Sequence, residues 1–342
     1  MKISSYLSKS LLLLAFAVVA VCIVYPAVLL ATGQLIFPFQ ANGSMVKGPD
    51  GKVVGSRLIA QPFTKNEYFW PRPSAAGNGY DASASSSSAL AASNYALRNR
   101  VAQMLGPIVT YKGGAKTGQP VAPDIETWFQ KDTYQGSPHI VSQWANMHNS
   151  AAQGWVTADP THGAYVDAWS RTHPTVVAQF IKDNPGTPKP AAADLAVVFF
   201  QNFSEEHPGK FPSAVTTTDK SGKSVTTIEP VNTGSDIQSN FFDMWRQDHP
   251  DVALEDVPGD YVTTSASGLD PDISLQNAEY QLDRVSTTWA TDLKRNVADV
   301  RKEVELMLQK HAKAPLWGLA GEKMVDVMDI NLELRNRYGA PQ

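Results

Sequence analysis

The chain has 342 residues, of which 43% are hydrophobic and 18% are charged, and its formal net charge is −4. A chain of this length and composition can bury one large core or two smaller ones, which excludes a disordered tail. The negative balance argues against nucleic acid as a partner. The single cysteine, Cys22, excludes both a disulfide framework and a cysteine metal site.

The first predicted element is a membrane span. Leu11 to Leu30 carries no charge, and the charge-free stretch extends from Ser10 to Val46, which is long enough to cross a bilayer. We predict a cytoplasmic N-terminus over residues 1–10 and an uncleaved transmembrane helix over residues 11–32. A cleaved signal peptide is the alternative, because a basic start precedes the apolar run. The run is long, however, and no small-x-small cleavage site follows it.

The flanking charges predict the orientation of this span. Lys2 and Lys9 precede it, whereas no basic residue follows Leu30 within about fifteen positions. The positive-inside tendency therefore places the N-terminus in the cytoplasm and the bulk of the chain outside.

Residues 33–106 are predicted to form the first part of an extracytoplasmic α+β core. Lys52–Ile59 reads as a short strand, and the two prolines in Tyr68–Ser74 favour an extended path over a helix interior. Tyr95–Leu105 is predicted to be a helix with three apolar residues on one face: Leu97, Val101 and Leu105.

Residues 107–255 have a different texture, with short aromatic helices separated by linkers rich in Pro, Gly and Thr. We interpret this region as a mostly helical insertion. An aromatic residue is followed four positions later by histidine in four places: Trp144 and His148, Trp169 and His173, Phe203 and His207, Trp245 and His249. Residues four apart share a helix face, and histidine in a last turn suits the helix dipole. Helix capping is therefore the preferred interpretation; metal binding, which needs the histidines to converge, and partner contact are the alternatives.

Residues 256–342 are predicted to form the second part of the core. Val257–Ser274 reads as a strand leading into a turn, with Ser274 as the N-cap of the next helix. Apolar residues three or four apart predict a long or broken amphipathic helix over Leu275–His311: Ala278, Leu282, Val285, Trp289, Leu293, Val297, Val300, Val304 and Met307. A short strand is expected at Val325–Val327, and the element after it is either strand or helix.

The string around Ser267 invites a catalytic interpretation, with Ser265 or Ser267 as nucleophile assisted by Asp270 or Asp272. A turn is the better interpretation, because Asp-Pro after Gly-Leu builds one and no histidine nearby offers a base. We therefore assign no catalytic residue and no metal ligand. The two aspartates also suggest a surface that enriches cations near a pore, but the small net charge makes that effect weak in salt.

Several strings resemble the Kdp family of potassium-transporting ATPase C subunits (KdpC). They are Phe-Pro-Phe-Gln-Ala-Asn-Gly-Ser (37–44), Gly-Ser-Arg-Leu-Ile-Ala-Gln (55–61), Phe-Trp-Pro-Arg-Pro-Ser (69–74), Thr-Ser-Ala-Ser-Gly-Leu-Asp-Pro-Asp-Ile-Ser (264–274) and the ending at 325–334. The resemblance covers residues 1–106 and 256–342. Its motif residues are Gly55, Ser56, Gln61, Arg72, Pro73, Ser74, Ser267, Gly268, Leu269, Asp270, Pro271, Ser274, Gln281, Arg284, Val285 and Asn331. The chain departs from the family in the insertion and at Ser85–Ala92, where the family has a glycine-rich segment.

The resemblance implies an accessory subunit of an ATP-driven potassium uptake complex in a bacterial inner membrane, with no enzymatic activity of its own. Its implied partners are a channel-like A subunit that selects potassium and a P-type ATPase B subunit. The family is described as supporting assembly and as a catalytic chaperone that raises the ATP affinity of the B subunit. No cofactor is expected here, because ATP and potassium are handled by the complex. The chain has no P-loop. The predicted topology also places the bulk of the chain away from cytoplasmic ATP. An anchored extracytoplasmic hydrolase and a partner-binding module are the alternatives.

Overall fold

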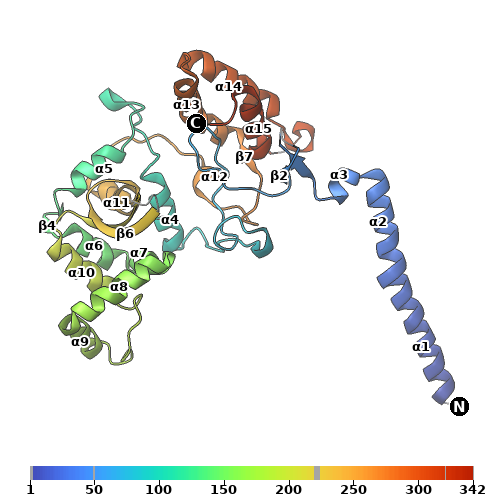
Figure 1. The fold of residues 1–342 in the computed structure, drawn as a ribbon, viewed down its shortest axis with the longest axis horizontal. Coiled ribbons are helices and arrows are strands. Elements are labelled where there is room, and N and C mark those ends of the chain that lie inside the picture. Colours follow the sequence, from blue (N-terminus) through green and yellow to red (C-terminus); the bar gives the residue numbers. More distant parts are fainter. Residues whose placement is uncertain (1–2, 49–50, 219–223, 320, 342) are drawn as a thin grey trace. The chain divides into compact units, whose positions relative to one another are not determined.

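The computed structural model describes residues 3–48, 51–218, 224–319 and 321–341 (Figure 1). The chain divides into two compact units. Unit 1 comprises residues 1–88 and 258–342, and unit 2 comprises residues 89–257. Unit 2 therefore interrupts unit 1 in the sequence. Helices combined with short antiparallel strands confirm the predicted mixture of α and β structure.

A continuous helix begins unit 1. It consists of α1 (Ile3–Val19), a π-helical turn (Ala20–Val24) and α2 (Tyr25–Ile36). Within the described residues, its 31-residue stretch Tyr6–Ile36 is the one helix long and apolar enough to cross a membrane. At 1.5 Å per residue that stretch is about 46 Å long, more than the apolar thickness of a bilayer. The π turn ends two residues before Pro26, whose missing N–H removes one helical hydrogen bond. The predicted span, residues 11–32, lies entirely within this helix.

Four short strands form two antiparallel pairs in unit 1. After a one-turn helix, α3 (Pro38–Ala41), strand β1 (Met45–Lys47) pairs with β2 (Val53–Ser56), which is shorter than the strand predicted over 52–59. Strand β7 (Asp272–Ser274) pairs with β8 (Met324–Asp326). A 3-10 turn, η2 (Ala82–Ala84), lies between these pairs in sequence, and Tyr68–Ser74 contains no helix, as predicted.

The helices of unit 1 correct one prediction and resolve two others. The strand predicted after Val257 is wrong, because Pro258 precedes a helical turn, α12 (Gly259–Val262), with Asp260 in its first turn. The long amphipathic pattern is broken into α13 (Leu275–Leu293) and α14 (Val297–His311), with Lys294 at φ +53° between them. After a 3-10 turn, η4 (Pro315–Gly318), and strand β8, the last element is a helix, α15 (Val327–Tyr338).

The core of unit 1 lies among α13, α14, α15 and the β7–β8 pair. Ser274 caps α13 as predicted, since its Oγ accepts a hydrogen bond of 3.1 Å from the amide of Asn277. Val297, predicted to face the core, is 43% exposed because it opens α14. The buried apolar residues are Phe69, Ile273, Ala278, Leu282, Val285, Trp289, Ala290, Val300, Val304, Met307, Leu308, Val325, Val327, Ile330 and Leu334.

Unit 2 is mostly helical, and its helices enclose an aromatic core. Trp144 is 1% exposed, and its ring lies 5.1 Å from that of Phe200, 5.3 Å from Phe211 and 5.8 Å from Phe241. Helix α11 packs against α4 and α5 (Figure 1). The elements are α4 (Tyr95–Leu105), η3 (Gly114–Lys116), α5 (Ala122–Phe129), β3 (Thr133–Tyr134), β4 (Ser137–Pro138), α6 (Ile140–Met147), α7 (Asn149–Ala158), α8 (Pro160–Thr172), α9 (Pro174–Asp183), α10 (Ala196–Glu206), β5 (Phe211–Thr218), β6 (Ser224–Val231) and α11 (Ser235–Asp248).

Helix α4 has the predicted bounds, but its most buried residue is Ala102, and the predicted apolar face is only half-buried. The β5–β6 hairpin was not predicted from the sequence. Unit 2 also begins at Ala89, ahead of the predicted insertion boundary at 107, because α4 packs within this unit against α11.

The four histidines of the aromatic–histidine pattern all terminate helices, which confirms the capping interpretation. Their amides donate to the carbonyl four residues earlier, at distances of 2.8, 3.1, 2.8 and 3.0 Å for His148, His173, His207 and His249. Asn184 ends α9 in the same way, at 2.9 Å from the carbonyl of Phe180. In the described part of the chain, no group of three or more His, Cys, Asp or Glu side chains is placed to hold a metal ion.

Candidate functional site

The motif residues come from two stretches far apart in sequence, and unit 1 brings most of them together. They form two connected sets. One set fixes the extended segment at Phe69 and Trp70, and the other fixes the turn that contains Gly268.

An amide clamp, defined as the side chains of Gln281 and Asn331, holds the extended segment. The Asn331 amide accepts from the Phe69 N–H and donates to the Phe69 carbonyl, both at 2.9 Å. The Gln281 amide does the same for Trp70, at 2.7 and 3.0 Å. Only a carboxamide offers a donor and an acceptor side by side in this way. The two side chains thus replace the strand partner that this proline-bounded segment lacks, at 1% exposure each.

Arg284 completes the clamp. Its guanidinium carbon lies 3.8 Å from the centroid of the Trp70 ring, a close cation–π contact. The same group donates to the carbonyls of Asn66 (2.8 Å) and Tyr68 (3.0 Å) and to the Gln281 side-chain oxygen (2.6 Å). Three motif residues of α13 and α15 are therefore committed to one stretch of backbone.

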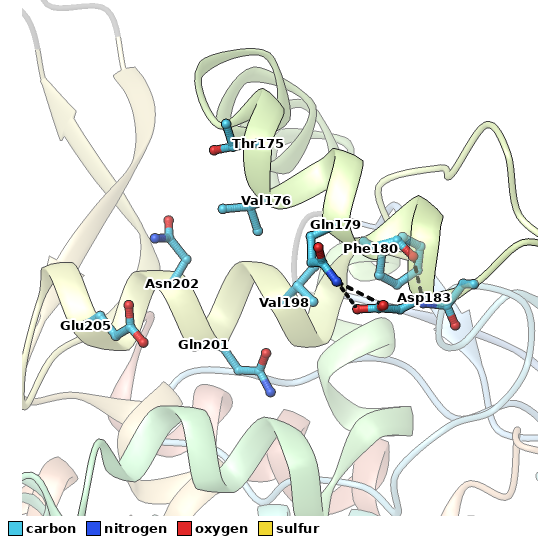
Figure 2. A pocket seen from close by; sticks show the side chains of 10 residues that line it. Thr175, Val176, Gln179, Phe180, Asp183, Val198, Gln201, Asn202 and Glu205 are labelled. Carbon is cyan, nitrogen blue, oxygen red and sulfur yellow. Dashed lines mark hydrogen bonds between the residues drawn. The ribbon is translucent and has the colours of Figure 1, made fainter.

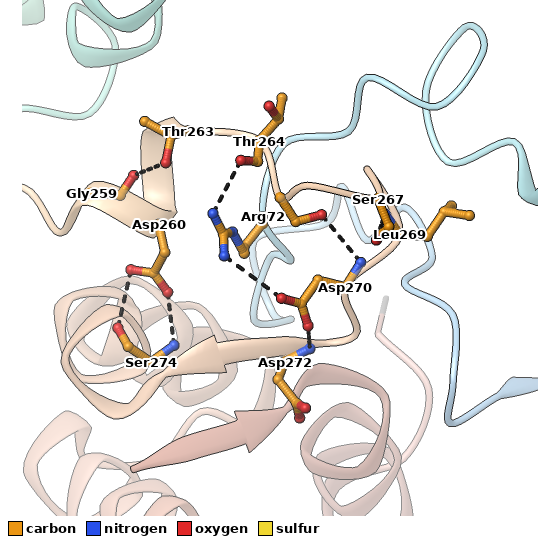
Figure 3. Close-up of polar contacts among 11 residues, drawn as sticks. Arg72, Gly259, Asp260, Thr263, Thr264, Ser267, Leu269, Asp270, Asp272 and Ser274 are labelled. Carbon is orange, nitrogen blue, oxygen red and sulfur yellow. Dashed lines mark hydrogen bonds and ion pairs between the residues drawn. The ribbon is translucent and has the colours of Figure 1, made fainter. Parts of the chain in front are cut away.

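The second set is centred on Arg72 and the turn before β7. Arg72 Nη2 donates to the carbonyl of Thr264 at 3.1 Å, and Nη1 lies 3.6 Å from a carboxylate oxygen of Asp270 (Figure 3). Asp270 in turn accepts from the amide of Asp272 at 3.1 Å. At the end of β7, the carboxylate of Asp260 accepts hydrogen bonds from the amide (2.7 Å) and the hydroxyl (3.0 Å) of Ser274.

Ser74 ties the Arg72 segment to this turn. Its hydroxyl donates to the carbonyl of Gly268 at 2.5 Å and accepts from the amides of Ala76 and Tyr80 at 3.1 and 2.8 Å. The Tyr80 hydroxyl donates to the carbonyl of Arg72 at 2.8 Å. Burial raises the pKa of Tyr80 to about 12, so this hydroxyl keeps its proton throughout the physiological range.

Gly268 is required by both conformation and space. Its φ is +70°, and a Cβ at this position would lie 2.6 Å from the Ser86 carbonyl oxygen and 2.8 Å from the Ala76 nitrogen. Ser85 Oγ and the Ser86 amide both donate to the carbonyl of Ser267, each at 3.0 Å. The segment in which this chain departs from the family's glycine-rich pattern therefore contacts the turn that contains Gly268 directly.

The two serines considered as nucleophiles serve this turn instead. The Ser267 hydroxyl accepts from the amide of Leu269 at 3.1 Å, and the Ser265 hydroxyl accepts from the amide of Asp270 at 3.4 Å. The histidine of unit 1, His311, is engaged with Glu333. The arrangement caps a turn and does not pair a nucleophile with a base.

The remaining motif residues support packing around these sets. A Cβ on Gly55 would lie 1.9 Å from the Gln61 side-chain nitrogen, so Gln61 lies directly on the backbone of β2. The Ser56 hydroxyl donates to the carbonyl of Gly43 at 2.6 Å. The backbone also contributes: the carbonyl of Pro271 accepts from Val327 at 3.1 Å, and that of Leu269 accepts from Ala60 at 2.9 Å. Val285 is fully buried in the core, and Pro73 is half-buried.

Sequence reasoning identified the motif residues but not how they are joined. Nothing in the sequence pairs Gln281 with Trp70 or Asn331 with Phe69, 211 and 262 positions apart. The signal that was available was the presence of carboxamides at positions where a helix stripe calls for apolar side chains.

A separate polar groove of about 540 Å³ lies between α9 and α10 in unit 2 (Figure 2). Gln179 donates to both carboxylate oxygens of Asp183 at 2.9 Å, and Asn202 accepts from the Trp169 indole at 2.7 Å. Its walls carry carboxamides and the carboxylates of Asp183 and Glu205 above apolar side chains. It offers hydrogen bonds but no nucleophile and base in contact.

Comparisons with known proteins agree with the family resemblance. The model of the KdpC family, described as "K+-transporting ATPase, c chain", matches residues 7–128 and 203–336. A potassium-transporting ATPase KdpC subunit from Caulobacter vibrioides (strain NA1000 / CB15N) is 48% identical over 97 residues, 28% of this chain and 49% of the relative. KdpC subunits from Myxococcus xanthus (52% over 83 residues, 24% and 39%) and Synechocystis sp. (51% over 77 residues, 22% and 40%) are also similar. The chain therefore spans about half the length, or less, of these curated relatives. The residues left unmatched between the two family segments, 129–202, all lie in unit 2.

Proposed function

The chain belongs to the KdpC family, the c chain of K+-transporting ATPase, and on that premise we propose that it is a non-catalytic subunit that supports assembly and stability of an ATP-driven potassium uptake complex. One observation carries the proposal. The motif side chains of unit 1 are used to fix the chain's own backbone, as in the double hydrogen bonds of Gln281 and Asn331. Buried side chains that brace the backbone in this way keep the surface around them rigid. A rigid surface suits docking to other subunits better than it suits catalysis.

The proposed partners are a channel-like A subunit that selects potassium and a P-type ATPase B subunit. We further propose that any increase in the ATP affinity of the B subunit is indirect, with the chain acting as a catalytic chaperone through contact between subunits. The support is chemical: the sequence has no P-loop to cradle phosphates.

A pull-down in mild detergent tests the partnership. The tagged full-length chain is captured from its native membrane, and the proteins that accompany it are identified by mass spectrometry. Recovery of a channel-like subunit and a P-type ATPase is the expected result. A chain that repeatedly purifies alone would overturn the proposal and favour the anchored hydrolase or the partner-binding module.

Photolabelling tests whether ATP contact is indirect. A photoreactive ATP analogue added to the purified complex is expected to label the P-type ATPase subunit and to leave this chain unlabelled. The ATP KM of the complex is expected to rise when this chain is left out. Labelling of this chain that excess ATP suppresses would contradict the indirect mechanism.

The proposed location is the bacterial inner membrane, crossed once, with the N-terminus in the cytoplasm and the bulk of the chain outside. Because Cys22 is the single cysteine, a Cys22→Ser background allows single cysteines to be placed at will. In intact cells, a membrane-impermeant maleimide is expected to label Thr217→Cys, on the exposed hairpin, and not Ser8→Cys. Labelling of Ser8→Cys and not of Thr217→Cys would show that the chain has the opposite orientation in the membrane.

A further inference from the structure

Two aspartates face each other across the β7–β8 ladder. The ladder has three register pairs, and the first of them joins Asp272 to Asp326. Side chains directly opposite each other in an antiparallel pair lie about 5 Å apart at Cβ, and like charges at such positions destabilise the pair. This short ladder therefore carries an unfavourable contact whenever both carboxylates are ionised.

The surroundings of the pair supply too little positive charge to cancel it. A cavity of about 320 Å³ is lined by both aspartates and by three further charged residues: Arg57, Lys313 and Asp329. Arg57 is already paired with Asp329 at 2.9 Å. From the preceding turn, Asp270 adds another carboxylate, which pairs with Arg72 at 3.6 Å. That leaves Lys313, whose backbone bridges to Met324 on β8, to face two carboxylates.

The titration of both aspartates agrees with this geometry. Burial, and after it the neighbouring Asp270, raises the pKa of Asp272. Burial raises the pKa of Asp326 to about 6, with Asp329 and Asp272 adding to the effect. Two adjacent carboxylates that both resist ionisation titrate as a coupled pair.

We propose that Asp272 and Asp326 form a proton-operated latch: one proton on the pair holds β7 and β8 together, and its loss loosens the end of the ladder. The latch is independent of the subunit assignment, since it rests on contacts within unit 1. The protonation of the pair is coupled through the backbone to both sets of motif residues. The amide of Asp272 is bonded to Asp270 in the motif turn, and Asp326 caps α15, the helix that carries Asn331, by accepting from the amide of Asp329 at 2.8 Å.

The direction of the effect follows from linkage. The folded state holds the proton more tightly than the unfolded chain does, so the ladder is most stable at acidic pH. Its stability falls as the pH rises from the ordinary aspartate range through about 6, and changes little above that. The latch is therefore closed in an acidified exterior and looser near neutrality.

Hydrogen exchange on the full-length chain in detergent tests this. Between pH 5 and pH 7.5, and after correction for intrinsic exchange rates, the amides of Ile273 and Val325 are expected to lose protection by about tenfold in the natural chain. Asp326→Asn keeps a side-chain oxygen for the α15 cap but removes the charge, and it is expected to show high protection at both pH values. Asp272→Asn removes one of the lesser causes of the raised pKa of Asp326, so it is expected to reduce the pH dependence without abolishing it, and the exposed Asp299→Asn should keep the natural pH dependence.

Three results would overturn the latch. The first is protection of the natural chain that does not vary with pH, and the second is an unchanged pH dependence in both Asn variants. The third is protection at pH 7.5 that potassium chloride restores and choline chloride does not. That result would make the pair a metal-cation site. If either Asn variant fails to fold, a carbon-13 titration of the side-chain carboxyls in the natural chain decides: the pair must show at least one midpoint near 6, and midpoints near 4 for both would reject the proposal.

Discussion

Units 1 and 2 of this chain are stabilised by different interactions. Unit 1 has two short strand pairs and holds its extended segment with buried amides and one arginine, each aimed at a particular backbone group. Unit 2 packs interlocking aromatic rings, and four of its helices, α6, α8, α10 and α11, end at a histidine of the aromatic–histidine pattern. Directional polar contacts tolerate few substitutions, whereas apolar packing tolerates many of similar volume. The family strings quoted above lie in unit 1, whereas the family model also matches residues 89–128 and 203–257 of unit 2 and leaves only its residues 129–202 unmatched.

The largest expected effect is on unit 2 alone. Trp144→Ala removes the ring at the centre of the aromatic core and should lower the free energy of unfolding of unit 2 by about 4 kcal/mol. Urea unfolding followed by hydrogen exchange and mass spectrometry reports the two units separately. Unit 1 should keep its protection, and the variant should still capture its partners; loss of both would mean that the units are not independent.

The clamp should be the most sensitive point of unit 1. Asn331→Leu leaves the Phe69 N–H and carbonyl without partners in a buried setting, which should cost unit 1 about 3 kcal/mol. Asn336→Leu, at an exposed position of the same helix, is the matched control and should change stability by less than about 0.5 kcal/mol. Equal losses of stability in the two variants would show that the clamp does not stabilise unit 1 specifically.

A smaller effect is expected at the turn. Gly268→Ala should cost about 2 kcal/mol, part from the left-handed backbone and part from the approach of Ser86. Gly51→Ala has a similar φ of +74° but no atom within 4 Å of the added methyl, so it should cost about 1 kcal/mol. Thermal unfolding of the two variants measures the difference between their losses of stability. Equal losses would show that the turn at Gly268 adjusts to the added methyl group at no cost in free energy.

The smallest effect concerns a helix cap in unit 2. His249 Nδ1 lies 2.8 Å from the carbonyl of Trp245, and His249→Ala should cost about 1 kcal/mol. His249→Asn should recover most of this loss, because Asn184 already donates to the carbonyl of Phe180 at 2.9 Å in the same role. Equal stability of the Ala and Asn variants in urea would show that packing of the ring, and not its hydrogen bond, matters.

Local patterns predicted local structure well. The helix at Tyr95–Leu105 and the Ser274 cap follow from periodicity and side-chain chemistry within a few residues, whereas the pattern over Leu275–His311 left open whether that helix is broken and did not locate the interruption after Leu293. The strand expected after Val257 is wrong because Pro258 is the N-cap of a helical turn, Gly259–Val262. The β5–β6 hairpin was missed although its threonines, valines and isoleucine favour strands.

Contacts across long separations could not be predicted in the same way. Gln281 looked like one polar position on an amphipathic helix, and only the fold shows that its amide meets Trp70. The facing of Asp272 and Asp326 likewise depends on strand register, which no local pattern determines. The motif strings singled out these residues, and the tertiary structure shows which backbone groups their side chains contact.

The separation of the clamp partners has a consequence for synthesis. Phe69 and Asn331 are 262 positions apart, so at ribosomal rates roughly 10–50 s pass between their appearance. For most of that interval, until Gln281 and Arg284 have been synthesised, the Phe69–Trp70 segment lacks its clamp, while all of unit 2 is completed and is free to fold. The nascent chain therefore carries an unfinished half-domain ahead of a finished one, and factors that shield extended aromatic segments during synthesis are expected to determine its yield more than they would for a chain that folds in sequence order.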